Sequence, residues 1–152
     1  MYTIYFDMDG TIANLYGVEN WLPKLRSENP SPYVEAMPLI DTEKFSEIIT
    51  DLQNIGFKIG IISWTAKNGS NSYNKKVRKA KLEWLVGCFP EIIFDEIHIV
   101  KYGTRKDYVA KDKEGIIFDD DDKVREKWKG EAINPNTEDI IEILKKLTEL
   151  TD

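Results

Sequence analysis

The sequence contains one cysteine, no long apolar run and no excess of positive charge. The single thiol, Cys88, excludes an intramolecular disulfide, and its apolar neighbours predict a small core residue rather than a nucleophile. No apolar stretch approaches the roughly 20 residues needed to cross a bilayer. The 21 basic and 27 acidic residues give a formal net charge of -6, which argues against general attraction to nucleic acids or anionic membranes. These absences favour a soluble cytoplasmic protein that must hold any anionic substrate by local contacts.

Short apolar runs alternate along the chain with segments of helical periodicity. Strands are predicted at Tyr2–Phe6, Phe57–Ile62, Ile97–Val100, Gly115–Phe118 and Glu131–Ile133. Helices are predicted at Ile40–Asn54, along an apolar stripe from Val77 to Cys88 that Gly87 and Pro90 stop, and at Ile140–Leu150. The length fits a single domain spanning residues 1–152. The alternation predicts an α/β fold, a three-layer Rossmann-like parallel sheet with helices on both faces and function at the carboxyl ends of the strands.

Two segments do not follow this pattern of core elements. Residues 12–40 are rich in proline and aromatic side chains, and they predict a small cap inserted over the site. The alternative is a surface connection whose aromatic side chains pack on the sheet edge. The basic run from Lys75 to Lys81 is interpreted as the solvated face of a helix, with steering of a phosphate as the alternative.

The first predicted strand leads directly into Asp7-Met8-Asp9-Gly10-Thr11. Continued as a strand, this segment places Asp7 and Asp9 on one side, roughly 6 to 7 Å apart, where a hard divalent cation can bind. Gly10 lets the backbone turn away, and Thr11 adds a hydroxyl beside the carboxylates. The alternative is an acidic turn that ends the strand. A helix-loop-helix calcium site is excluded because the glycine and the glutamate it requires are not at the correct positions.

Three later strand ends offer complementary groups. Ser63 follows one strand, and a hydroxyl near free backbone amides is suited to a phosphoryl oxygen. Lys106 is predicted in the first turn of a short helix, where a cation is unfavourable unless it meets an anion, and Lys101 competes for this role. Asp119 and Asp120 follow another strand and are expected to face Asp7, whereas the next two aspartates are expected to begin a helix.

Taken in order, these residues resemble the motifs of the haloacid dehalogenase superfamily of phosphatases and phosphotransferases. The opening Asp7-Met8-Asp9-Gly10-Thr11 resembles the first motif, and the three later motifs are matched by Ser63, Lys106 and Asp119-Asp120. The opening and the double aspartate look most like the small 5'(3')-deoxyribonucleotidase branch and related phage and bacterial proteins. The chain departs from that branch at Thr11 and Asn14 and within Ser63-Trp64-Thr65, which leaves the substrate open.

The resemblance implies a Mg²⁺-dependent phosphomonoester hydrolase that acts through an aspartyl-phosphate. In this reading Asp7 is the nucleophile, Asp9 transfers protons and Lys106 balances charge. Phosphate binding is assigned to Thr11, Ser63, Trp64 and Lys106, and metal binding to Asp7, Asp9 through its backbone carbonyl, Asp120 and Asp119. A small phosphorylated partner is implied, with a nucleoside 5'-monophosphate as the first substrate hypothesis. The alternatives are a sugar-phosphate or polynucleotide-end phosphatase, or a metal-binding interaction module without turnover.

Overall fold

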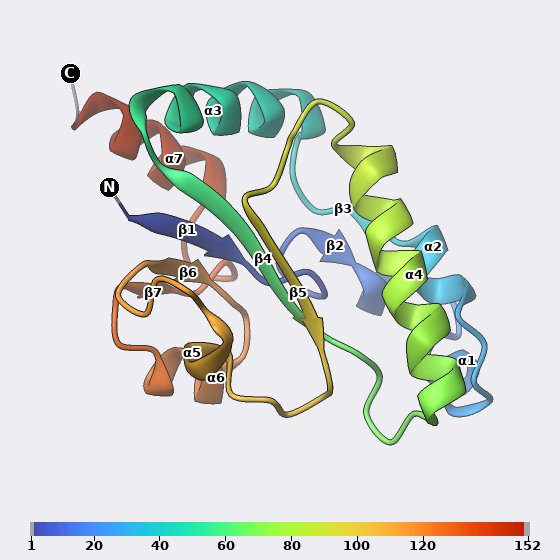
Figure 1. Cartoon of the computed structure of the whole chain (residues 1–152). Helices are drawn as coiled ribbons and strands as arrows, with labels where there is room; N and C mark the ends of the chain where they lie inside the picture. Colours follow the sequence, from blue (N-terminus) through green and yellow to red (C-terminus); the bar gives the residue numbers. More distant parts are fainter. Residues whose placement is uncertain (1, 151–152) are drawn as a thin grey trace.

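The computed structural model of the chain describes residues 2–150, and a five-stranded parallel sheet forms its centre (Figure 1). The strand order is β5-β4-β1-β6-β7. The strands span Thr3–Phe6 (β1), Lys58–Trp64 (β4), Glu96–Val100 (β5), Ile116–Phe118 (β6) and Ala132–Ile133 (β7). All neighbouring pairs are parallel, and β1 pairs with both β4 and β6. The predicted α/β fold is therefore confirmed, and the residue after β1 lies at the middle of the sheet edge.

Helices cover both faces of this sheet (Figure 1). One face packs against α3 (Thr42–Ile55), the C-terminal part of α4 (Asn71–Cys88) and α7 (Ile140–Glu149). The opposite face packs against side chains of α6 (Asp122–Lys127) and of the segment that follows α5 (Lys106–Val109). The arrangement has three layers, as the sequence predicts.

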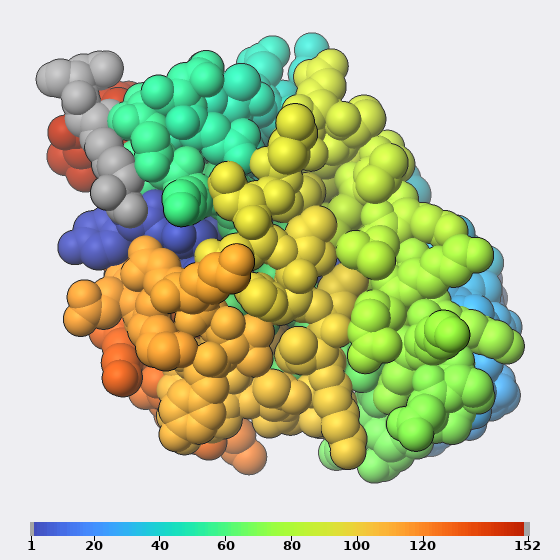
Figure 2. Space-filling model, viewed as in Figure 1, coloured from blue at the N-terminus to red at the C-terminus, as the bar shows by residue number. Residues whose placement is uncertain are grey.

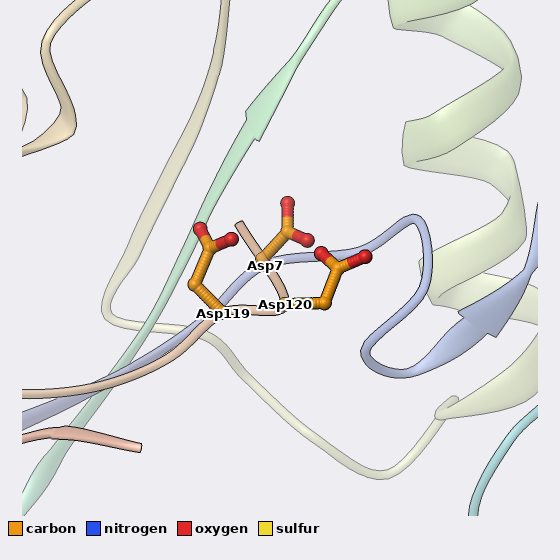
Figure 3. A group of neighbouring side chains, drawn as sticks. All are labelled: Asp7, Asp119 and Asp120. Atoms are coloured by element: carbon orange, nitrogen blue, oxygen red, sulfur yellow. The ribbon is translucent and has the colours of Figure 1, made fainter. Parts of the chain in front are cut away.

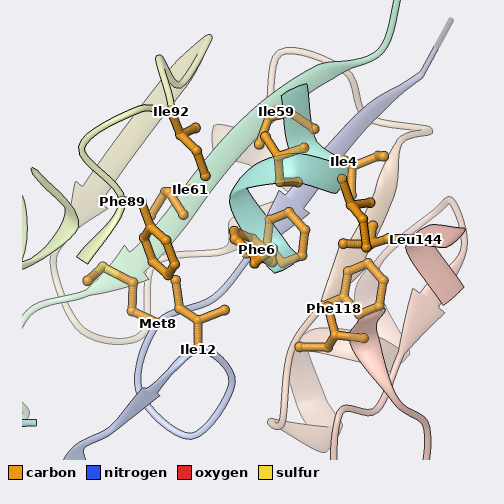
Figure 4. Close-up of a cluster of buried hydrophobic side chains, with 14 of the residues drawn as sticks. Ile4, Phe6, Met8, Ile12, Ile59, Ile61, Phe89, Ile92, Phe118 and Leu144 are labelled. Carbon is orange, nitrogen blue, oxygen red and sulfur yellow. The ribbon is translucent and has the colours of Figure 1, made fainter. Parts of the chain in front are cut away.

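The apolar core fixes the strand that carries the first motif. Phe6 is fully buried, and its ring centroid lies 5.1 Å from the ring centroids of both Phe45 on α3 and Phe118 on β6. Figure 4 shows Phe6 and Phe118 within this core. Burial of one such ring contributes roughly 2 to 3 kcal/mol. Because Phe6 and Phe118 are also partners in the sheet register, the residues after them leave the sheet side by side.

The helix boundaries differ from the sequence predictions at α4. The helix begins at Asn71, one turn and a half before the apolar stripe, because Ser70 caps it by accepting a hydrogen bond from the backbone N–H of Tyr73. It ends at Cys88, between Gly87 and Pro90, the two residues that were predicted to stop it. Asp41 caps α3 by accepting a hydrogen bond from the backbone N–H of Lys44. Cys88 is half-buried and packs against the main core, in line with a structural thiol.

Residues 12–40 form a folded insertion, which contains β2 (Ala13–Asn14), a 3₁₀ turn (η1, Leu15–Gly17), α1 (Trp21–Arg26), α2 (Ser31–Glu35) and β3 (Met37–Pro38). The strands β2 and β3 pair antiparallel. Leu15 and Tyr33 are buried against Tyr73, Val77 and Ala80 of α4. The space-filling view shows the insertion (blue) behind α4 at one end of the molecule (Figure 2). The predicted domain 1–152 includes residues 1, 151 and 152, which lie outside the described residues.

Within residues 2–150, no helix has the length and apolar character needed to cross a membrane.

Candidate functional site

Three carboxylates converge at the carboxyl ends of β1 and β6 (Figure 3). Asp7 follows β1, and Asp119 and Asp120 follow β6. One carboxylate oxygen from each residue lies within 4.8 Å of the other two. Asp7 and Asp119 are buried and Asp120 is half-buried. The parallel register of Phe6 with Phe118 brings this cluster together, as the strand-end argument predicts.

A buried lysine lies against this cluster. Lys106 begins α5, is 3% exposed, and donates hydrogen bonds to Asp7 Oδ1 (2.8 Å) and Asp119 Oδ2 (2.7 Å). Burial alone would lower the pKa of Lys106, but the charges of Asp7 and Asp119 outweigh it and raise that pKa. The predicted competitor, Lys101, is exposed, so Lys106 is the lysine that contacts Asp7.

The two oxygens of Asp119 already have donors. Oδ2 accepts from Lys106, and Oδ1 accepts from the backbone N–H of Asp121 at 2.9 Å. Among residues 2–150, Asp120 forms no ion pair with a basic side chain. Burial, followed by the charge of Asp7, raises the pKa of Asp120 to about 8 and that of Asp119 to about 7. A divalent cation would relieve this repulsion, and carboxylate oxygens are the donors that Mg²⁺ prefers. The residues therefore fit Mg²⁺, and the carboxylate of Asp120 is more available to the ion than that of Asp119, whose two oxygens already accept hydrogen bonds.

Gly10 is required beside this cluster. Its φ of +81° lies in the left-handed region, and a Cβ at this position would lie 2.2 Å from Asp120 Oδ2. Thr11 is 2% exposed and donates its hydroxyl to Asp7 Oδ2 at 3.1 Å. In this structure Thr11 orients the carboxylate of Asp7. Its assignment to phosphate binding stays a prediction.

The side chain of Asp9 lies apart from the three-carboxylate group and meets a second buried lysine. Lys81 of α4 is 1% exposed and donates hydrogen bonds of 2.7 Å each to Asp9 Oδ2, Ser63 Oγ and the carbonyl oxygen of Trp64. Burial raises the pKa of Asp9, although the charge of Lys81 opposes this shift. The Asp9 side chain is therefore not part of the three-carboxylate group, and a metal role for its backbone carbonyl stays a prediction.

The interpretation of Lys81 as part of a solvated helix face is wrong. The other members of the run, Lys75, Lys76, Arg78 and Lys79, are all exposed, as that interpretation predicts. Lys81 stands four residues after Val77 and three before Trp84, which places it on the same buried stripe. That spacing was the available signal, and it was obscured by the charge of the residue.

The predicted phosphate-binding residues occupy different positions in the site. Ser63 lies inside β4 rather than after it, is 1% exposed, and accepts from Lys81. The Nζ of Lys106 lies 5.1 Å from the ring centroid of Trp64, whose Nε1 donates to the carbonyl of Thr104. Thr65, which the sequence analysis did not select, is 2% exposed, and its hydroxyl has no hydrogen-bond partner among the described residues. A buried hydroxyl left unpaired in this way costs about 1 to 3 kcal/mol unless a ligand pairs with it.

A cavity of about 1140 Å³ opens over these groups. Asp7, Asp9 and Lys106 are among the polar residues that line it. Two aromatic pairs also contribute to its wall, each with ring centroids 4.9 Å apart, and they are Tyr16 with Trp21 and Trp64 with Tyr102. Basic side chains in the lining are Arg26, Lys67, Arg105, Lys123 and Lys127. Trp21 and Tyr33 of the insertion both line the cavity, but Tyr33 is also packed in the small core beside α4.

No protein-family model matches the chain, and no curated protein gave a significant match. The resemblance therefore rests on the motif residues alone.

Proposed function

We propose that the protein is a Mg²⁺-dependent phosphomonoester hydrolase of the haloacid dehalogenase type, with Asp7 as its nucleophile. One observation carries the proposal: Asp7 lies at the end of the central strand, between the ammonium of Lys106 and the carboxylate of Asp120. This arrangement suits a nucleophile because the lysine can balance charge on a transferring phosphoryl group. A structural ion pair alone would not require a cavity that opens over the same carboxylate.

The proposed reaction has two steps. In the first, a carboxylate oxygen of Asp7 forms a bond to phosphorus, the bond from phosphorus to the ester oxygen breaks, and Asp9 gives its proton to the departing oxygen. In the second, Asp9 takes a proton from water and the water oxygen forms a bond to phosphorus. The bond between phosphorus and Asp7 breaks, which frees inorganic phosphate and restores the Asp7 carboxylate. Lys106 stabilises the negative charge in both steps.

Mg²⁺ would be held by Asp7, Asp120 and the backbone carbonyl of Asp9, with Asp119 as the alternative carboxylate. The metal would supply charge neutralisation at the phosphoryl oxygens. Of the predicted phosphate-binding residues Thr11, Ser63, Trp64 and Lys106, Trp64 and Lys106 line the cavity, whereas Thr11 and Ser63 do not. We add Thr65, which also lines the cavity and whose buried hydroxyl has no partner among the described residues.

The proposed substrate is a nucleoside 5'-monophosphate or another small phosphate ester. The proposed location of the protein is the cytoplasm. Aromatic rings in the cavity wall suit a planar ligand, and the basic side chains there can pair with its phosphate, while the carboxylates in the same wall require the metal to offset their charge. The volume of about 1140 Å³ exceeds what a monophosphate fills, so the sugar-phosphate and polynucleotide-end alternatives remain outcomes of the substrate test.

Phosphate release from a panel of nucleotides, sugar phosphates, 3'- and 5'-phosphorylated oligonucleotides and an aryl phosphate tests the proposal. We expect release with Mg²⁺, none with excess chelator, and essentially none from an Asp7→Asn variant under any condition. Turnover in chelator equal to that in Mg²⁺ would contradict the metal role. A folded wild-type protein that hydrolyses no ester would leave the non-catalytic metal-binding module as the better hypothesis.

A further inference from the structure

Lys81 is a buried cation to which the proposed reaction assigns no role. Its ammonium has three N–H donors, and all three meet acceptors at 2.7 Å: Asp9 Oδ2, Ser63 Oγ and the carbonyl of Trp64. Its Nζ also lies 5.1 Å from the ring centroid of Tyr33 in the insertion. The lysine thereby links α4, the end of β4, the loop after β1 and the insertion.

Burial of this ammonium is costly in free energy. A lysine on a helix ordinarily extends its head group into water, whereas Lys81 turns inward and is 1% exposed. Removing a charged group from water costs several kcal/mol, which the pairing must offset. A methionine of similar shape would fill the position without that cost. Stability alone is therefore a weak explanation for the residue.

The contacts of Lys81 restrict the carboxylate of Asp9. Only Oδ2 of Asp9 accepts from the lysine, and no hydrogen bond from the described part of the chain reaches Oδ1. Asp9 lines the cavity, but Lys81 and Ser63 do not. The lysine therefore holds one oxygen from behind, and the other oxygen remains available to a group in the cavity.

We infer that Lys81 is a positioning residue for proton transfer by Asp9. This inference rests on the proposed function. The ammonium, itself anchored by Ser63 and the Trp64 carbonyl, fixes Asp9 through Oδ2, so that Oδ1 exchanges the proton with the ester oxygen and later with water. Lys81 forms no bond to substrate. Its loss should affect the step that needs the proton and leave substrate binding largely intact.

The size of the effect follows from the dependence of proton transfer on geometry. A positioned acid or base contributes roughly 10² to 10⁴ in rate. Displacement of a reacting group by about 1 Å can cost about 10²-fold. We expect Lys81→Met to lower kcat for an alkyl phosphate by about 10²-fold, with a change in KM of less than about threefold. An aryl phosphate with a good leaving group needs no acid, so its first step should be nearly unchanged.

The test compares Lys81→Met with Lys79→Met, a control on the same helix. The Lys79 side chain is 78% exposed and pairs only weakly with Glu83, at 3.8 Å. Each variant is assayed with an alkyl phosphate and with an activated aryl phosphate, by initial burst and by steady-state turnover. The expected result for Lys81→Met is a burst of phenol near one equivalent, slow turnover, and a large loss with the alkyl ester. The control should behave as wild type.

A double variant separates positioning from folding. In Asp9→Asn/Lys81→Met the buried charge pair is replaced by two neutral side chains, which protects the fold if the single Lys81→Met variant is unstable. If Lys81 acts through Asp9, the double variant should turn over within about threefold of Asp9→Asn. A further loss of about 10²-fold in the double variant, or loss of the aryl-ester burst in Lys81→Met, would overturn the positioning role. Full activity of Lys81→Met would also overturn it. A wild-type protein without any turnover would overturn the proposed function and this inference together.

Discussion

Neutralising Asp120 should stabilise the metal-free protein and abolish its response to Mg²⁺. The Asp120 carboxylate lies in a group whose oxygens are within 4.8 Å of one another, and Lys106 contacts only the other two members. In an Asp120→Asn variant the shape is kept and the charge is removed. The metal-free protein no longer has the repulsion between Asp120 and the other two carboxylates, and the metal site loses the one carboxylate of the three that Lys106 does not contact.

The magnitude follows from the distance. Two unit charges within 4.8 Å of each other repel by at least about 3.5 kcal/mol at an effective dielectric constant of about 20. Because burial raises the pKa of Asp120 to about 8, this residue is largely protonated at pH 7 and part of the repulsion is already avoided. The gain in unfolding free energy should therefore be about 1 to 2 kcal/mol, or a rise in Tm of about 2 to 8 °C for a domain of this size.

The pH dependence has a defined sign. The pKa of Asp120 is higher in the folded state than the ordinary carboxyl value of 3.8, so the folded state binds more protons between pH 4 and about 8. Its contribution to stability is complete below the unfolded pKa and is lost as the pH rises through the folded pKa. Metal-free wild type should lose stability across this window, by at most about 1.4 kcal/mol per pH unit from this group. The Asp120→Asn variant should show a flatter profile.

Thermal unfolding with chelator and with millimolar Mg²⁺ measures both effects. At a Mg²⁺ concentration about 100 times Kd, wild type should gain about 2.7 kcal/mol, and Asp120→Asn should gain much less. The matched control is Asp119→Asn, which removes a charge partner of Lys106 and should lower metal-free stability while weakening Mg²⁺ less. A metal-free Asp120→Asn protein less stable than wild type, or an unchanged Mg²⁺ response, would refute the reasoning.

Three further substitutions test single contacts in the cavity. Lys106→Ala should lower turnover by at least about 10²-fold because it removes the charge beside Asp7, whereas Lys101→Ala should change turnover by less than about twofold. An unaffected Lys106 variant would return the role to Lys101. Thr65→Val should raise KM for a monoester by about threefold to tenfold and leave the free energy of unfolding unchanged or higher. A lower free energy of unfolding with an unchanged KM would show that the hydroxyl is structural. Trp21→Ala should change the preference between nucleotides and sugar phosphates and spare an aryl phosphate, and a uniform loss would assign the ring to packing.

The fold and the carboxylate cluster could be predicted from sequence because each depends on strand periodicity. The apolar runs mark the strands, and a parallel sheet necessarily gathers the residues after β1 and β6 at one edge. Lys106 was predictable because a cation in the first turn of a helix implies an anion nearby. No comparable local rule indicated where β4 ends. The start of α4 at Asn71 was missed because residues 71–76 carry few apolar side chains, although Ser70, which caps the helix, was a local signal for it.

The hydrogen bonds of Lys81 and the burial of the Thr65 hydroxyl depend on distant parts of the chain, which sequence patterns do not reveal. The acceptors Ser63 and Asp9 lie 18 and 72 residues from Lys81. A lysine with suitable buried acceptors and one that faces water look the same in a helical pattern, and only position on the stripe distinguishes them.

The division of charge in the site leads to one further expectation. The carboxylates outnumber the ammonium groups, with Asp7, Asp9, Asp119 and Asp120 against Lys81 and Lys106, so above about pH 8, where Asp119 and Asp120 are both ionised, the site carries a net charge of -2. A phosphate dianion that enters such a site without a cation meets net repulsion, while a bound divalent cation brings the site to neutrality. Inorganic phosphate alone should therefore leave Tm unchanged, Mg²⁺ alone should raise it, and the two together should raise it by more than the sum. Equal stabilisation by phosphate in chelator would show that the lysines bind the anion unaided, and the pairing of Asp120 with the metal would then lose its electrostatic reason.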